Sequence, residues 1–68
     1  MKLEYDKDVD AAYIYLKYPL KMGEAKKTIA LNDNIIIDFD KNNKLIGMEV
    51  LNASKVLAKR VLVQAKAV

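Results

Sequence analysis

The sequence predicts an α+β fold, a meandering antiparallel sheet of about five strands followed by one C-terminal helix. Residues 1–51 hold short alternating or β-branched segments separated by Asn, Asp, Gly and Pro, which is typical of strands joined by turns. From residue 53 onward the chain consists mostly of good helix formers, without Gly or Pro. No linker, repeat or low-complexity segment divides residues 1–68, so we expect a single domain.

The first three strands are predicted from alternating apolar and polar residues. Leu3 and Tyr5 share one side of the first strand, opposite charged residues. An aspartate-rich turn follows that strand, and Pro19 and Gly23 mark the loop before the third. These strands are expected at residues 2–6, 12–17 and 24–31.

Residues 38–49 fit two alternatives, a calcium loop and a β-hairpin. Ligand-type residues fall at positions 1, 3, 5 and 12 of a calcium loop, namely Asp38, Asp40, Asn42 and Glu49. Such a loop needs a helix on each side. Three isoleucines precede it instead, and Gly47 lies where the second helix would begin. We therefore favour the hairpin and expect no metal ion or other cofactor.

The hairpin has a register that agrees with its apolar pattern. An Asn42-Asn43 turn suits a two-residue type I′ loop, in which both residues have positive φ. The fourth and fifth strands are then expected at residues 34–40 and 44–51. Three apolar pairs follow on one face: Phe39 with Ile46, Ile37 with Met48, and Ile35 with Val50.

One helix is expected over residues 53–66, with Asn52 as its N-cap. A broad apolar stripe of this helix would cover the sheet. A second, narrower stripe includes Val56 and Val63, and a helix with two apolar sides normally contacts two partners. The valines at 61 and 63 lower the helix propensity of the last turns.

Composition excludes several classes of function. The chain has no Cys and no His, so disulfides, thiolate metal sites and the usual general base are absent. Its two glycines form no phosphate-binding loop. We therefore expect a protein that is not an enzyme. Because 68 residues bury little surface alone while 53% of them are hydrophobic, we expect a homodimer.

Charge is distributed unevenly along the chain. Residues 1–49 carry eight Lys and nine acidic residues, whereas residues 50–68 carry four basic residues and no acid. These basic residues are Lys55, Lys59, Arg60 and Lys66. Four charges are few for nucleic-acid binding, which we do not expect.

No apolar run is long enough to cross a membrane, and the first residues do not resemble a secretory signal. We therefore expect a cytoplasmic protein.

Two sets of residues are candidates for function. Polar residues of the first turn and the strands could form a polar site, although turn stabilisation explains the aspartates more simply. The four tyrosines, all within residues 5–18, are expected to form an aromatic cluster. Apolar residues left outside the core would form the dimer interface. The polar candidates are Asp6, Asp10, Tyr13 and Glu49. The interface candidates are Ile36, Leu45, Leu51, Val56 and Val63.

Two blocks of the sequence resemble the domain of unknown function 2283 family. The first is Tyr5-Asp6 followed by Asp10-Ala11-Ala12-Tyr13-Ile14. The second is Ile37-Asp38-Phe39-Asp40 followed by residues 45–54. The family commonly has Asp-Gly where Asn42-Asn43 stands here. The resemblance implies a small antiparallel sheet followed by a helix, without an assigned activity. Some relatives resemble partners of small toxins, so the resemblance adds an antitoxin-like partner of a small toxin to the two functions that the residues suggest, a self-associating interaction module and a weakly basic nucleic-acid binder.

Overall fold

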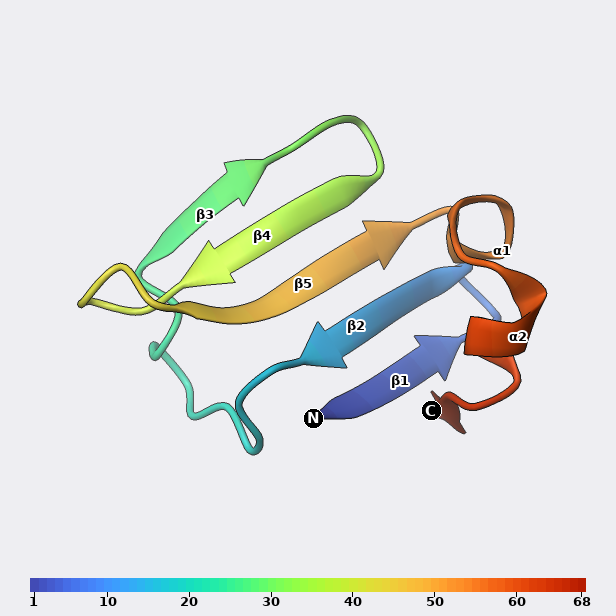
Figure 1. Ribbon diagram of the computed structural model, residues 1–68, viewed down its shortest axis with the longest axis horizontal. Coiled ribbons are helices and arrows are strands. Elements are labelled where there is room, and N and C mark those ends of the chain that lie inside the picture. The colour runs from blue at the N-terminus through green and yellow to red at the C-terminus, as the bar shows by residue number, and fades with distance from the viewer.

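The computed structural model describes residues 1–68 as one six-stranded sheet with two short helices at one end (Figure 1). The predicted α+β class is confirmed, but the sheet has six strands rather than five, and the single helix is replaced by two. The elements are β1 (Lys2–Asp6), β2 (Ala11–Tyr15), β3 (Lys27–Ala30), β4 (Ile35–Phe39), β5 (Leu45–Leu51), α1 (Ala53–Val56), α2 (Lys59–Leu62) and β6 (Lys66–Ala67).

The strand order is β3-β4-β5-β2-β1-β6, so the sheet is not the simple meander that was predicted. The β1–β2 hairpin and the β3–β4–β5 meander are joined by antiparallel pairing of β2 with β5. Residues 16–26 connect β2 to β3 past the ends of β5 and β4 (Figure 1). The N–H groups of Leu16 and Lys17 each donate to the carbonyl of Ile46 at 3.1 Å, which anchors the start of this loop.

The predicted β4–β5 hairpin is confirmed, with a change near its turn. Ile37 pairs with Met48 and Ile35 with Val50, as expected. Phe39, however, pairs with Leu45 rather than Ile46, because the register shifts after Asp38.

The side chain of Asp40 explains this shift. Its Oδ1 accepts the N–H groups of Asn42 at 2.8 Å and Lys44 at 3.0 Å, which favours a wider loop than the two-residue turn. Only Asn43 has a positive φ, of 62°, where both Asn residues were expected to.

Strand alternation gives the sheet two different faces. The registers place the residues of each face together across β1 to β5. The apolar face consists of Leu3, Tyr5, Ala12, Ile14, Ile29, Ile35, Ile37, Phe39, Met48 and Val50, with Lys27 at its margin. The polar face consists of Lys2, Glu4, Asp6, Ala11, Tyr13, Tyr15, Thr28, Ala30, Ile36, Asp38, Gly47, Glu49 and Leu51.

The predicted helix is interrupted at Leu57 and Ala58, whose ψ angles of 142° and 144° are extended. No Gly or Pro marks this break. Packing explains it: Val56, Leu57 and Leu62 all pack against the cluster of Ala12, Val50 and Ala53. A continuous helix would point Val56 and Leu62 in different directions, and the break lets both reach the apolar face. Neither helix is long and apolar enough to cross a membrane.

The core is small: Ala12, Val50 and Ala53 form the cluster against which both helices pack, and Ile46 is buried separately at the hairpin end of β5. Only five residues are buried, four of which are apolar side chains and the fifth Gly47. After α2 the chain turns back, and β6 pairs in parallel with β1, beside Glu4 and Tyr5. This sixth strand begins at Lys66, the last residue of the expected helix.

Candidate functional site

The centre of the polar face holds a hydrogen-bonded group of side chains from three strands, β2, β3 and β4, which spans the intervening β5. Tyr13 of β2 donates its hydroxyl to Oδ2 of Asp38 on β4 at 2.6 Å. Thr28 of β3 donates its hydroxyl to Oδ1 of the same carboxylate at 2.7 Å. Asp38, the first position of the rejected calcium loop, lies on the outward face of the hairpin, is half-buried and accepts two side-chain donors.

Gly47 makes this arrangement possible. It lies on β5, between Tyr15 of β2 and Asp38 of β4, and the Tyr13 ring lies over it. A Cβ at position 47 would be 2.7 Å from the Cε1 and Cζ atoms of the ring, closer than real Cβ contacts. The tyrosine can therefore reach Asp38 across β5 only because the residue between them lacks a side chain.

Glu49 is the direct cross-strand neighbour of Tyr13 on β5, so two of the four polar candidates meet. Burial raises the pKa of the Tyr13 phenol, and the hydrogen bond to Asp38 and the charge of Glu49 raise it further. Tyr13 therefore stays protonated as a hydrogen-bond donor, which does not suit it to act as a base near neutral pH.

The remaining tyrosines of this region form a row beside the same network. The Tyr13 and Tyr15 ring centroids are 4.7 Å apart, and Tyr18 meets Tyr15 edge-on at 5.2 Å. Tyr15 donates to Glu4 at 2.9 Å, and Lys2 lies 4.1 Å from the centroid of the Tyr18 ring. A cluster of all four tyrosines was predicted; three form it, on the polar face with their hydroxyls engaged, whereas Tyr5 lies on the apolar face and binds Asp10. The neighbouring acids do not favour a phosphate backbone.

Asp10 has a structural role at the opposite end of the sheet. Its Oδ1 accepts the Tyr5 hydroxyl at 2.7 Å and the Ser54 N–H at 2.9 Å, while Oδ2 accepts the Ser54 hydroxyl at 2.7 Å. These bonds hold the start of α1 against the β1–β2 turn. Asn52, the predicted N-cap, precedes α1 but makes no side-chain cap; its amide donates to Asn34 instead. Asp6 makes only a local bond to the Asp8 N–H.

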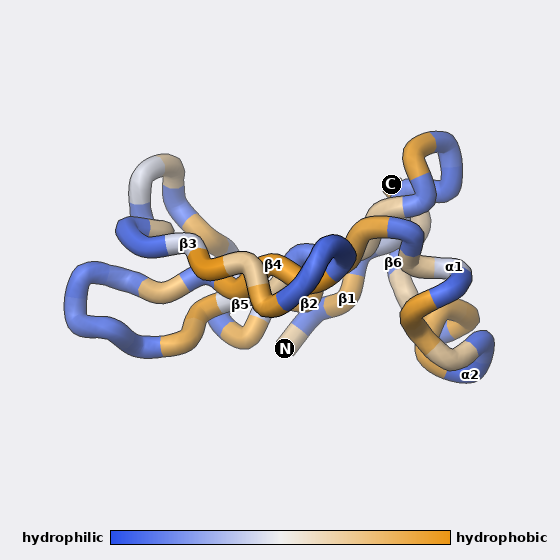
Figure 2. The backbone as a smooth tube through the Cα atoms, turned by 90° about the horizontal axis from the view of Figure 1, so that it is seen from above, coloured by the Kyte–Doolittle hydropathy of each residue, from blue (hydrophilic) through white to orange (hydrophobic).

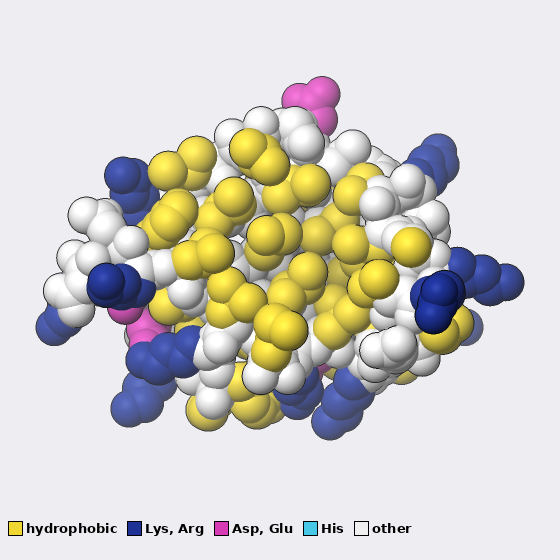
Figure 3. Space-filling model, viewed as in Figure 1, with side chains coloured by type: hydrophobic (Ala, Val, Ile, Leu, Met, Phe, Trp, Pro, Cys, Tyr) yellow, Lys and Arg dark blue, Asp and Glu magenta, His cyan; other side chains and the backbone are white.

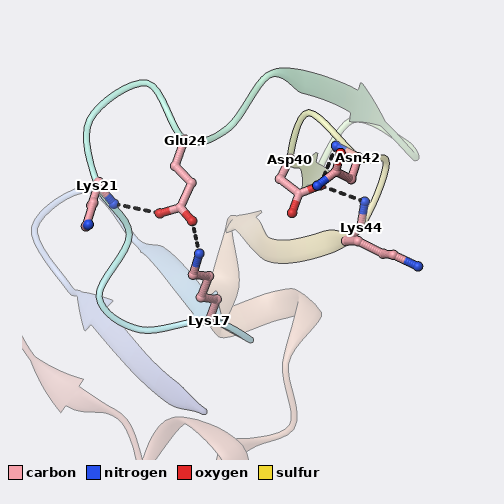
Figure 4. A network of polar contacts seen from close by, with 6 residues as sticks. All are labelled: Lys17, Lys21, Glu24, Asp40, Asn42 and Lys44. Carbon is pink, nitrogen blue, oxygen red and sulfur yellow. Dashed lines mark hydrogen bonds and ion pairs between the residues drawn. The ribbon is translucent and has the colours of Figure 1, made fainter.

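The other end of the sheet has a polar hollow of about 330 Å³ between the 16–26 loop and the β4–β5 turn. Its two acids have separate partners, as Figure 4 shows. Glu24 pairs with the Lys17 ammonium and accepts the Lys21 N–H, whereas Asp40 accepts the N–H groups of its own turn. These interactions lower the pKa of both carboxyls, chiefly through Lys17 for Glu24 and the Lys44 N–H for Asp40. The two acids beside this hollow therefore hold the 16–26 loop and the β4–β5 turn in place.

A second hollow of about 450 Å³ lies on the apolar face, between β1, β2 and α2. Its walls include Leu3, Ile14 and Val61, with Arg60 at the edge. The other three basic residues of the C-terminal segment are exposed and lie on α1, α2 and β6. They are therefore spread over three elements.

The five interface candidates do not form one surface. Ile36 and Leu51 are half-buried on the polar face. Leu45, at the hairpin end, is 44% exposed, and Val63, after α2, is 71% exposed. Val56 packs against the core cluster.

Two residues that organise these sites, Gly47 and Asp38, were not among the candidate site residues. The signal for the first was present: a glycine inside a strand pattern indicates close approach of another group. Nothing in the sequence pairs Tyr13 with Asp38, because their strands are not neighbours in the sheet.

Calcium or magnesium at millimolar concentration should leave the melting temperature unchanged. The oxygens of Asp38 and Asp40 already accept protein donors, and no group of three or more acidic side chains is placed to hold a metal ion. A ligand that binds only the folded state would raise the melting temperature. Differential scanning fluorimetry measures it, and a rise that disappears in Asp38→Asn would contradict the hairpin interpretation.

Comparison with known proteins gives a family but no activity. An uncharacterized protein of Methanocaldococcus jannaschii is 45% identical over 56 residues, covering 81% of this chain and 43% of that protein. This chain therefore spans less than half of the length of that relative. No solved structure matches this chain significantly. Residues 2–54, which include all five main strands and the start of α1, match the model of a family described as proteins of unknown function, DUF2283. The chain belongs to the DUF2283 family.

Proposed function

We propose that this protein is a small interaction module that associates with itself and does not catalyse a reaction. The observation that carries the proposal is its exposed area. The chain exposes 5048 Å², about 700 Å² more than the roughly 4,300 Å² typical of a compact 7.7 kDa monomer. Its radius of gyration of 11.8 Å also exceeds the value of about 10.9 Å expected for this length.

The hydrogen bonding of the hydroxyl groups supports an interaction role over catalysis. The Tyr5, Tyr13 and Tyr15 hydroxyls each donate to a carboxylate. Both side-chain hydroxyls of other types, on Thr28 and Ser54, also donate to aspartates. Each of these carboxylates also binds a second donor or a Lys ammonium, so none is placed solely to activate a hydroxyl as a nucleophile.

Light scattering at micromolar protein concentration tests the proposal. We expect twice the 7.7 kDa chain mass, with a melting temperature that rises with concentration, because association stabilises the folded state by mass action. A particle of one chain mass, with a melting temperature independent of concentration, would show that self-association is wrong.

A further inference from the structure

The helices cover the apolar face at only one of its ends. Val56, Leu57 and Leu62 pack over Ala12 and Val50 at that end. Both helices project from the same side of the sheet, away from β3 (Figures 1 and 2). The part of the face over β3, β4 and β5 has no helix above it. We call this part the open strip, which consists of Ile29, Ile35, Ile37, Phe39 and Met48.

The open strip has the composition of an interface core. All five side chains are apolar and none is fully buried, and Ile29 is 43% exposed. Figure 3 shows this face as a continuous apolar area with charged side chains around its margin. Lys27, the first residue of β3, is the cross-strand partner of Phe39 and lies at the margin of the strip. Contiguous apolar patches of several hundred Å² usually mark binding surfaces.

We propose that the open strip is the surface on which a second copy of the chain docks, face to face, about a two-fold axis. This inference rests on the proposed self-association and specifies its surface. The excess exposure of about 700 Å² is close to the roughly 800 Å² that each partner buries in an interface of standard size. An identical strip carries no charge that would repel its counterpart, and a two-fold contact uses the same patch on both chains.

The shape of the chain restricts how two copies meet. Two sheets packed face to face lie about 10 Å apart, with strands about 30° from parallel. The helices project from the face that docks (Figure 2), so they would collide if the copies were stacked in the same orientation. Each copy must therefore place its helices beyond the β3 edge of the other. The dimer would bury both open strips and leave both polar faces outside.

Two adjacent isoleucines provide a matched test of the surface. Ile37 lies in the open strip, whereas Ile36, also half-buried on β4, lies on the polar face. We expect Ile37→Asp to reduce the mass measured by light scattering from two chains to one, and Ile36→Asp to leave two chains. A dimer that survives Ile37→Asp, or that only Ile36→Asp dissociates, would overturn the inference while leaving the proposed self-association intact. A wild-type monomer would instead refute the proposed function.

Thiol labelling decides the matter if either aspartate variant fails to fold. The chain has no cysteine, so Ile29→Cys and Ala30→Cys each introduce a single thiol on neighbouring, exposed positions of β3 that face opposite ways. We expect maleimide to modify Cys at 29 about tenfold more slowly when protein concentration is raised well above the dissociation constant. The rate at position 30 should stay constant. If the labelling rates at both positions depended equally on protein concentration, the open strip would be excluded as the dimer surface.

Discussion

Replacing Gly47 by alanine is expected to lower the free energy of unfolding by about 1–3 kcal/mol, the usual cost of adding atoms to a filled site. The new methyl group would lie 2.7 Å from two ring carbons of Tyr13. The ring must then move, and its hydroxyl loses the 2.6 Å bond to Asp38. Denaturation by urea, monitored by circular dichroism, measures the difference.

Repeating Gly47→Ala in a protein that already carries Tyr13→Ala shows whether the ring contact causes the loss of stability. In Tyr13→Ala the ring is absent, so Gly47→Ala should cost little or even stabilise, because alanine restricts the unfolded chain more than glycine does. An equal cost in both backgrounds would show that the ring contact is not responsible. In Gly47→Ala alone, the pKa of the displaced Tyr13 should also fall toward its ordinary value, since burial is the main reason that it is raised. Alkaline absorbance titration follows that change.

Asp10→Ala is expected to release the start of α1 and produce a clear fall in melting temperature. No other side chain accepts as many hydrogen bonds, from the Tyr5 hydroxyl and from both the N–H and hydroxyl of Ser54. Asp10 also has a φ of 53°, a left-handed conformation that alanine adopts at a cost. Thermal unfolding followed by circular dichroism measures the effect, which is largest at neutral pH.

The control is Asp10→Asn, which tolerates the same backbone conformation and keeps one acceptor oxygen while losing the charge. It should therefore destabilise less than Asp10→Ala. If both variants lower the melting temperature equally, neither the retained acceptor oxygen nor the tolerated backbone conformation of Asn contributes to stability, and the assigned role of Asp10 is wrong.

The charge of Asp10 also makes stability depend on acid. The Tyr5 hydroxyl, followed by the two Ser54 donors, lowers the pKa of this carboxyl below its ordinary value of 3.8. A carboxyl with a lowered pKa stabilises the folded chain when ionised, so its contribution is complete above about pH 4 and is lost as the pH falls further. Asp10→Asn should remove this part of the acid dependence. The part that arises from Glu24 and Asp40 should remain.

The strands could be predicted because each has a local pattern, and the hairpin pairs of Ile35 and Ile37 followed from the same alternation. The order of the strands could not. Pairing of β2 with β5 depends on which hairpin edge buries more surface, and no residue in the 16–26 loop specifies it. The break at Leu57 was equally hidden, since helix propensity favours continuation and only packing against Val50 favours the interruption.

The candidate sites were predictable in part. Asp10, Tyr13 and Glu49 were all among the polar candidates chosen from the sequence. Their partners, Ser54 and Asp38, lie far away in sequence and become neighbours only through the β2–β5 pairing and the chain reversal at α1. A strand glycine was the local sign that something must lie across β5, although it could not name Tyr13.

The β2–β5 ladder has a consequence for how the chain folds. Ala12 pairs with Val50, whereas every other pairing of the first five strands joins successive segments. The β1–β2 hairpin and the β3–β4–β5 unit can each form early, because closing a short loop costs little entropy. Their docking must wait for the most distant contact, and such non-local contacts slow folding. Until then the edges of β2 and β5 are both unpaired, so newly made chains are most exposed to aggregation before this one ladder closes.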